Sequence, residues 1–118
     1  MPGWTDWRKL ADKHGWYDLM LDWDGPACYE LGTGGPRGGR IEPHYVGETV
    51  CESLRMTAYG GNGSHLGAII DDHLRDGWTL YYRAMALPTK RMAKMMQDRL
   101  LERFRYDWNV LLNGVRYR

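Results

Sequence analysis

The chain has 118 residues, of which 43% are apolar and six are tryptophan, and its formal net charge is +1. This length fits one domain with a single core, and the composition excludes a disordered chain. No apolar run approaches a membrane span and no signal-peptide pattern opens the chain. We therefore expect an intracellular protein, cytoplasmic or (in a eukaryote) nuclear, without a membrane partner. The two cysteines, Cys28 and Cys51, lack metal-ligand spacing and are expected to be free thiols.

Charge is distributed unevenly along the chain. From Pro88 onward there are eight lysines and arginines against three acidic residues, whereas acidic residues are in excess before that point. A basic C-terminal third can face a phosphate backbone, but it can equally be a solvated helix surface with ordinary salt bridges. Charge alone leaves both interpretations open.

Residues 1–24 hold four of the six tryptophans. Thr5 or Asp6 is a suitable N-cap, so the pattern predicts a short helix through His14, ended by Gly15. We expect this tryptophan-rich extension to pack on the domain that follows and to supply core area, with base stacking as the alternative role.

Two strands are predicted next, at residues 27–31 and 43–46, and each carries a tyrosine, Tyr29 and Tyr45. The glycine-rich join at residues 32–40 indicates a hairpin with a long, mobile tip. Residues 50–59 are expected to be helical, which places Arg55 and Tyr59 on one helix face because they are four residues apart.

The second half of the chain predicts one more strand and two helices. Ser64 is a suitable N-cap for a helix over 65–76, residues 78–85 form the third strand, and Thr89 caps a long helix that ends near Phe104. The predicted fold class is therefore α+β, with a small three-stranded antiparallel sheet flanked by helices.

On the long helix Gln97 shares a face with apolar residues, where an unpaired amide would cost about 1–3 kcal/mol. That face is predicted to hold Ala93, Met96, Gln97, Leu100, Leu101 and Phe104.

Several short motifs follow one another in a recognisable order. They are Ala27-Cys28-Tyr29, Tyr45-Val46-Gly47, then Arg55 and Tyr59, and finally Trp108-Asn109-Val110-Leu111-Leu112. In this order and spacing they resemble the GIY-YIG nuclease family, over roughly residues 25 to 114. The resemblance implies a nuclease domain at residues 25–118, with residues 1–24 outside it.

The resemblance also implies a function and a set of site residues. It implies a DNA endonuclease that hydrolyses phosphodiester bonds with Mg²⁺ or Mn²⁺ and needs no small-molecule cofactor. Either Tyr29 or Tyr45 would activate the attacking water, Arg55 would hold the scissile phosphate, and Asn109 would brace the site. The implied catalytic residues are Tyr29, Tyr45, Arg55, Tyr59, Gln97 and Asn109. The implied DNA contacts are Gly47, His65, Arg37, Arg40, Lys90 and Lys94.

Gln97 departs from the family pattern, because it stands where the family has its metal-binding glutamate. A glutamine keeps the size of the side chain and loses its charge, whereas Mg²⁺ is bound through carboxylates, phosphate oxygens and water. One explanation is an inactivated Glu→Gln form of a working nuclease, which the retention of the other site residues favours. The other is a natural homologue that binds DNA without cutting it.

The segment from Phe104 to Asn109, with Asn113-Gly114, also resembles a subgroup found in plant transcription-effector proteins and in small bacterial or viral nucleases. This resemblance supports the alternative of a catalytically inactive, DNA-binding regulatory module. A plain protein-interaction domain would leave the ordered tyrosines and Arg55 unexplained. One domain of this size has little surface for reading bases, so recognition is expected to need a homodimer or loop contacts.

Overall fold

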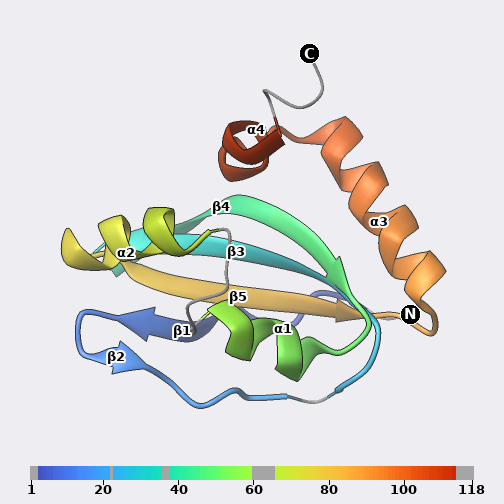
Figure 1. The fold of residues 1–118 in the computed structure, drawn as a ribbon, viewed down its shortest axis with the longest axis horizontal. Coiled ribbons are helices and arrows are strands. Elements are labelled where there is room, and N and C mark those ends of the chain that lie inside the picture. Colours follow the sequence, from blue (N-terminus) through green and yellow to red (C-terminus); the bar gives the residue numbers. More distant parts are fainter. Residues whose placement is uncertain (1–2, 22, 36–37, 60–65, 114–118) are drawn as a thin grey trace.

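The computed structural model describes residues 3–21, 23–35, 38–59 and 66–113. Within them lie one five-stranded antiparallel sheet, with the strand order β2-β1-β5-β3-β4, and four helices (Figure 1). The strands are β1 (Arg8–Asp12), β2 (Gly15–Trp16), β3 (Ala27–Gly35), β4 (Gly38–Thr49) and β5 (Thr79–Ala86). The helices are α1 (Glu52–Tyr59), α2 (Gly67–Arg75), α3 (Lys90–Arg103) and α4 (Asp107–Asn113). No helix among the described residues has the length and apolar character needed to span a bilayer.

The N-terminal segment contradicts the prediction of a helix between Thr5 and His14. Thr5 runs alongside β5, because its N–H donates to the Ala84 carbonyl at 2.9 Å and its hydroxyl accepts from the Ala84 N–H at 3.1 Å. The following residues form β1 and β2, so the sheet has five strands rather than the predicted three. The backbone groups on the outer edge of β5 need partners, and this long-range pairing outweighs the local helix signals.

A register shift in β1 explains why its side-chain pattern is difficult to recognise in the sequence. Between Lys9 and Ala11 the pairing with β5 slips by one residue. Leu10 and Ala11 are consequently both buried, although a regular strand points neighbouring side chains to opposite faces.

The glycine-rich join is strand rather than the predicted long, mobile hairpin tip. β3 continues through Gly35 and β4 begins at Gly38, while Pro36 and Arg37 lie outside the described residues. At Gly32 a Cβ atom would stand 2.7 Å from the Glu42 carbonyl oxygen and 3.1 Å from the Trp7 ring. Glycine at this position therefore serves close packing inside the sheet.

The helices α1, α2 and α3 agree with the sequence prediction, whereas α4 was not predicted. Thr89 caps α3, and its hydroxyl accepts from the Met92 N–H at 3.1 Å. The helix ends at Arg103, with Phe104 as the C-cap. The predicted cap Ser64 lies outside the described residues, and α2 begins at Gly67.

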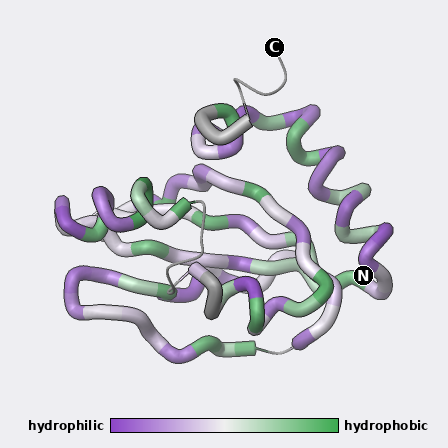
Figure 2. Tube along the Cα trace, viewed as in Figure 1, coloured by the Kyte–Doolittle hydropathy of each residue, from purple (hydrophilic) through white to green (hydrophobic). Residues whose placement is uncertain are grey.

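The sheet has two covered faces. One face carries Tyr29, Leu31, Tyr45 and Tyr82 and packs under α1 and α2 together with Trp108. The other face packs against α3, through a cluster of Trp4, Cys28, Met85, Val46, Leu87, Ala93, Met96, Leu100 and Tyr106. Figure 2 shows hydrophilic and hydrophobic residues interleaved along α3, which agrees with the exposure of Leu101 and Phe104 at the end of the predicted apolar stripe.

Candidate functional site

Three tyrosines from three elements meet on the α1 side of the sheet. The hydroxyl oxygens of Tyr29 in β3 and Tyr59 in α1 are 2.5 Å apart. The Tyr29 ring centroid lies 6.2 Å from that of Tyr45 in β4 and 6.1 Å from that of Tyr59. We call these three residues the tyrosine cluster. The structure therefore brings together the three phenols that the sequence singled out.

Gly47 creates the space for this cluster. It is paired with Tyr29 across the β3–β4 hairpin. A Cβ atom on Gly47 would stand 2.6 Å from the Cζ atom of Tyr29 and closer still to its hydroxyl oxygen. The Tyr29 ring thus lies directly over the glycine, and packing accounts for Gly47, for which the family resemblance implied a DNA contact.

The protonation state of the cluster follows from its burial. Burial raises the pKa of Tyr29 well above its ordinary value, and the neighbouring Tyr59 and Tyr45 raise this pKa further. Burial also raises the pKa of Tyr45 and of Tyr59, and the charge of Arg55 only partly offsets this effect. A tyrosine acting as a base near neutral pH would need a lowered pKa. The cluster instead presents neutral hydroxyls, which can donate hydrogen bonds.

Arg55 supplies the positive charge beside the hydroxyls. It is exposed on α1, one turn before Tyr59, and its charge lowers the pKa of all three tyrosines. The start of α1 is fixed by Asp24, whose carboxylate accepts from the Ser53 N–H and from the Ser53 hydroxyl, both at 2.8 Å. These bonds lower the pKa of Asp24. The cluster and Arg55 together place one exposed cation beside several buried hydroxyl groups, and these are the kinds of group that bind an anion.

Gln97 and Asn109 meet at the backbone of Val46 and not at the hydroxyls. The Val46 N–H donates to the Asn109 Oδ1 atom at 2.9 Å, and the Asn109 Nδ2 atom donates to the Val46 carbonyl at 3.0 Å. The Gln97 Nε2 atom donates to the same carbonyl at 3.5 Å. Because β4 is an edge strand, these amides complete the hydrogen bonding that a further strand would otherwise provide.

The described residues around position 97 do not fit a divalent cation held there. Gln97 offers a neutral amide, and Asp98 is paired with Lys94 at 2.9 Å. Glu48 has a buried oxygen with no hydrogen-bond partner among the described residues, but it pairs with Cys28 across the hairpin. Paired residues share a sheet face, so Glu48 lies on the face opposite the tyrosine cluster. No group of three His, Cys, Asp or Glu side chains gathers in the described part of the chain.

The remaining predicted DNA contacts do not join the cluster. Lys90 is exposed at the start of α3, and Lys94 in the same helix is paired with Asp98. Arg40 is exposed in β4 and lines a separate hollow. Arg37 and His65 lie outside the described residues.

The sequence analysis missed a histidine bridge between β3, β4 and α4. His44 lies 2.8 Å from the Thr33 hydroxyl through Nε2 and 2.8 Å from the Asp107 carboxylate through Nδ1, and it stacks on Trp108 with ring centroids 4.9 Å apart. The order Asp–His–Thr resembles a nucleophile with its base, but Thr33 is only 3% exposed. The bridge therefore fixes α4 on the sheet. The one signal for it was Pro43, whose place in a strand indicates an edge or a bulge, and a register shift occurs there.

Both cysteines are free thiols, as the sequence predicted. Cys28 is buried, and this burial, with the charges of Glu30 and Glu48, raises its pKa to about 12. A thiol in this state is a packing group and not a nucleophile.

Comparisons with known proteins found a matching family and a similar curated protein. Residues 25–118 match the family described as GIY-YIG domain-containing protein. The chain is similar to Protein EFFECTOR OF TRANSCRIPTION 3 from Arabidopsis thaliana, with 32% identity over an alignment 136 residues long. The alignment covers 95% of this chain and 52% of that protein. The chain thus spans about half the length of this curated relative, and no solved structure matches it. The family match confirms the resemblance found in the motifs, and the chain belongs to the GIY-YIG domain family.

Proposed function

We propose that this domain is an intracellular DNA-binding module that holds a phosphodiester at the tyrosine cluster and Arg55 without cleaving it. Membership of the GIY-YIG family indicates a nuclease-type fold, and nucleases of this family generally depend on a divalent metal ion. The observation that supports the proposal most directly is the convergence of three phenol groups beside one exposed arginine.

The chemistry of these groups suits binding. A guanidinium donates two parallel hydrogen bonds to phosphate oxygens, and such charge-assisted bonds are stronger than neutral ones. The phenols keep their protons because burial raises their pKa values, so they act as donors toward a phosphate. Arg55 would carry the charge recognition, and the tyrosines would orient the phosphate.

Position 97 is the reason for proposing binding without cleavage. A divalent cation beside the phosphate would neutralise charge that develops in the transition state. Gln97 is neutral, and its amide donates to the Val46 carbonyl, so it provides no carboxylate for such an ion. The similarity to a protein named as an effector of transcription also favours a regulatory role.

Arg55→Ala tests the binding proposal. Loss of a charged hydrogen-bond donor costs about 1.5–3 kcal/mol, which corresponds to a roughly 10- to 100-fold weaker affinity. Fluorescence anisotropy with a labelled duplex at low salt measures the change. Arg75→Ala is the matched control, because Arg75 is an exposed arginine on α2 paired with Asp72. Equal affinity of the two variants would refute a phosphate site at Arg55.

The second candidate function is a metal-dependent endonuclease present as an inactivated Glu-to-Gln form. It is favoured by the presence of Tyr29, Tyr45 and Tyr59 in one cluster with Arg55 beside them. The variant Gln97→Glu would then nick supercoiled plasmid with Mg²⁺ or Mn²⁺, and the double variant with Arg55→Ala would not. If Gln97→Glu binds the plasmid but leaves it intact with either ion, the chain is not a disabled nuclease.

Recognition of a particular base sequence would require more surface than this domain offers, so we propose a homodimer as the DNA-bound form. Sedimentation of the protein with and without a duplex measures the stoichiometry. A complex with one protein per duplex and a single-site footprint would contradict the proposal.

A further inference from the structure

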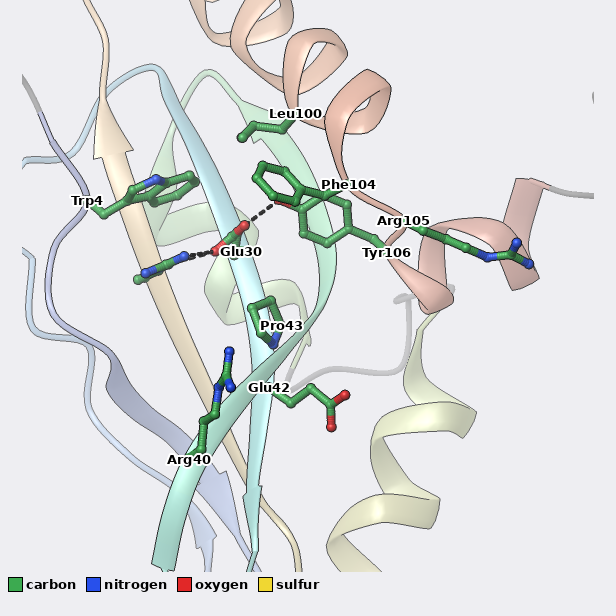
Figure 3. Close-up of a pocket in the computed structure, with 10 residues that line it drawn as sticks. Trp4, Glu30, Arg40, Glu42, Pro43, Leu100, Phe104, Arg105 and Tyr106 are labelled. Carbon is green, nitrogen blue, oxygen red and sulfur yellow. Dashed lines mark hydrogen bonds and ion pairs between the residues drawn. The ribbon is translucent and has the colours of Figure 1, made fainter.

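The sheet face opposite the tyrosine cluster holds a hollow of about 500 Å³ (Figure 3). This volume lies in the range of about 300–1,000 Å³ that is typical of small-molecule sites. The residues that matter for its chemistry are Trp4, Glu30, Arg40, Arg83, Phe104 and Tyr106. They come from the N-terminal segment, from β3, β4 and β5, and from the end of α3 with the turn that follows it.

The floor of the hollow is a closed network of charges. The Glu30 side chain is 4% exposed, and its Oε1 atom accepts from Arg83 at 2.6 Å. Its Oε2 atom accepts a hydrogen bond from the Tyr106 hydroxyl. The Arg83 guanidinium also lies 4.8 Å from the Trp4 ring centroid and 4.5 Å from that of Trp7. The floor is therefore electrically balanced, and its groups are held in place before any ligand binds.

The walls are aromatic. Trp4 lies on one side of Glu30, and Phe104 and Tyr106 lie on the other (Figure 3). Phe104 is 54% exposed, and its ring meets Tyr106 edge-on with centroids 6.5 Å apart. A large aromatic side chain that remains open to solvent beside a hollow can stack on a flat ring.

The rim carries the charge that decides the class of ligand. The Arg40 side chain points into the hollow, whereas Arg105 and Glu42 point away from it (Figure 3). Within the described part of the chain, no carboxylate forms an ion pair with the Arg40 guanidinium. Aromatic walls with a free carboxylate would suit an ammonium ligand, but Glu30 is already neutralised by Arg83. The positive charge of Arg40, which points into the hollow, therefore favours an anionic ligand.

We propose that this hollow binds a nucleoside monophosphate unit, with the base between Trp4 and Phe104 and the phosphate on Arg40. The unit can be a free nucleotide or one unpaired nucleotide of a DNA strand, because both present the same ring and the same phosphate chemistry. The site uses none of the residues of the tyrosine cluster, so its test does not depend on the function proposed above.

The test is a calorimetric titration of the full chain with 2′-deoxyadenosine 5′-monophosphate, with deoxyadenosine and with inorganic phosphate. Phe104→Ala should weaken binding of the nucleotide roughly tenfold or more, because stacking on an aromatic side chain is lost. Arg40→Ala should weaken binding of the nucleotide but not of the nucleoside. Met92→Ala and Arg75→Ala should leave nucleotide affinity unchanged. Met92 is an exposed apolar residue of α3, Arg75 is an exposed arginine of α2, and neither lines the hollow.

A second arm uses a short single-stranded oligodeoxyadenylate labelled at its end. Tighter binding of this oligonucleotide than of the mononucleotide, lost in Phe104→Ala, assigns the site to a DNA strand. Tighter binding of the mononucleotide assigns it to a free nucleotide. The proposal is overturned if the nucleotide does not bind at millimolar concentration, if inorganic phosphate binds equally well, or if Phe104→Ala and Met92→Ala behave alike. Circular dichroism checks that each variant is folded.

Discussion

Gly47 has no room for a side chain, because the Cβ atom of an alanine there would stand 2.6 Å from the Cζ atom of Tyr29. Gly47→Ala must displace this ring and should lower the free energy of unfolding by about 1–3 kcal/mol. Urea denaturation measures the change. Gly67→Ala is the matched control, since nothing lies within 4 Å of the corresponding Cβ position at the start of α2. Equal stability of the two variants would show that Tyr29 can move away at little cost.

The tyrosine cluster should make stability fall at alkaline pH. An unfolded tyrosine has a pKa of about 10, and the pKa values of Tyr29, Tyr45 and Tyr59 are raised in the folded protein. The folded state therefore holds its phenolic protons more tightly. This contribution to stability is fully present below pH ~10 and is lost as the pH rises above it.

Unfolding free energies measured across this pH range, together with the near-ultraviolet absorbance of tyrosinate, check this expectation. In the folded protein, some tyrosines should ionise only at a pH above that at which tyrosines of the unfolded chain ionise. Part of the tyrosinate absorbance should therefore appear late in the titration. Tyr59→Phe should remove one late-titrating group. A single transition at the ordinary tyrosine pKa for all eight tyrosines would contradict the burial argument.

The residues of the candidate site were predictable where a motif fixed their positions. Tyr29, Tyr45 and Tyr59 meet in the structure because the hairpin register and α1 bring them together. His44 and Glu30 were missed because their partners are distant in sequence, and Pro43 beside His44 was the one local signal. Glu30 is indistinguishable from an ordinary strand residue until Arg83 and Tyr106 are seen beside it.

At the scale of elements, Asn109 attaches α4 to the backbone of β4 at Val46, beside the His44 bridge. Asn109→Ala would leave the N–H of Val46 and part of its carbonyl without a partner, at a cost of about 1–3 kcal/mol in unfolding free energy. Hydrogen exchange of the Val46 amide reports this loss directly. Asn109→Asp keeps an acceptor for the Val46 N–H but loses the donor to the Val46 carbonyl. The Val46 amide should therefore exchange more slowly in Asn109→Asp than in Asn109→Ala. Equal protection in both variants would mean that Asn109 is not the partner that matters.

The sequence predicted elements well when their signals were local. Thr89 caps α3 through its own hydroxyl, and that signal needs no distant contact. The segment after Thr5 was mistaken for a helix, because its conformation depends on pairing with β5, far along the chain. Gly32 and Gly34 were mistaken for a loop, because the rings beside them belong to distant residues, Trp7 and Tyr81, which no local pattern reveals.

At the scale of the whole molecule, the described residues before position 25 are part of the fold, although the family match begins at residue 25. They supply β1, β2 and the buried Leu10 and Ala11. Deleting them would expose one edge of β5 and the core beneath it. The fragment 25–118 should therefore lose its cooperative thermal transition or aggregate, as measured by circular dichroism and light scattering. A fragment that melts like the full chain would show that the segment is dispensable.

The amide contacts at Val46 also limit how this protein can associate. An uncovered edge strand offers its N–H and C=O groups to any neighbouring chain, and open-ended polymers grow in this way. Here both groups of Val46 are already bonded to side chains of the same molecule. A second copy therefore cannot add a strand to β4 at Val46 unless α4 first detaches. The edge of the sheet at this residue is closed to strand pairing between molecules.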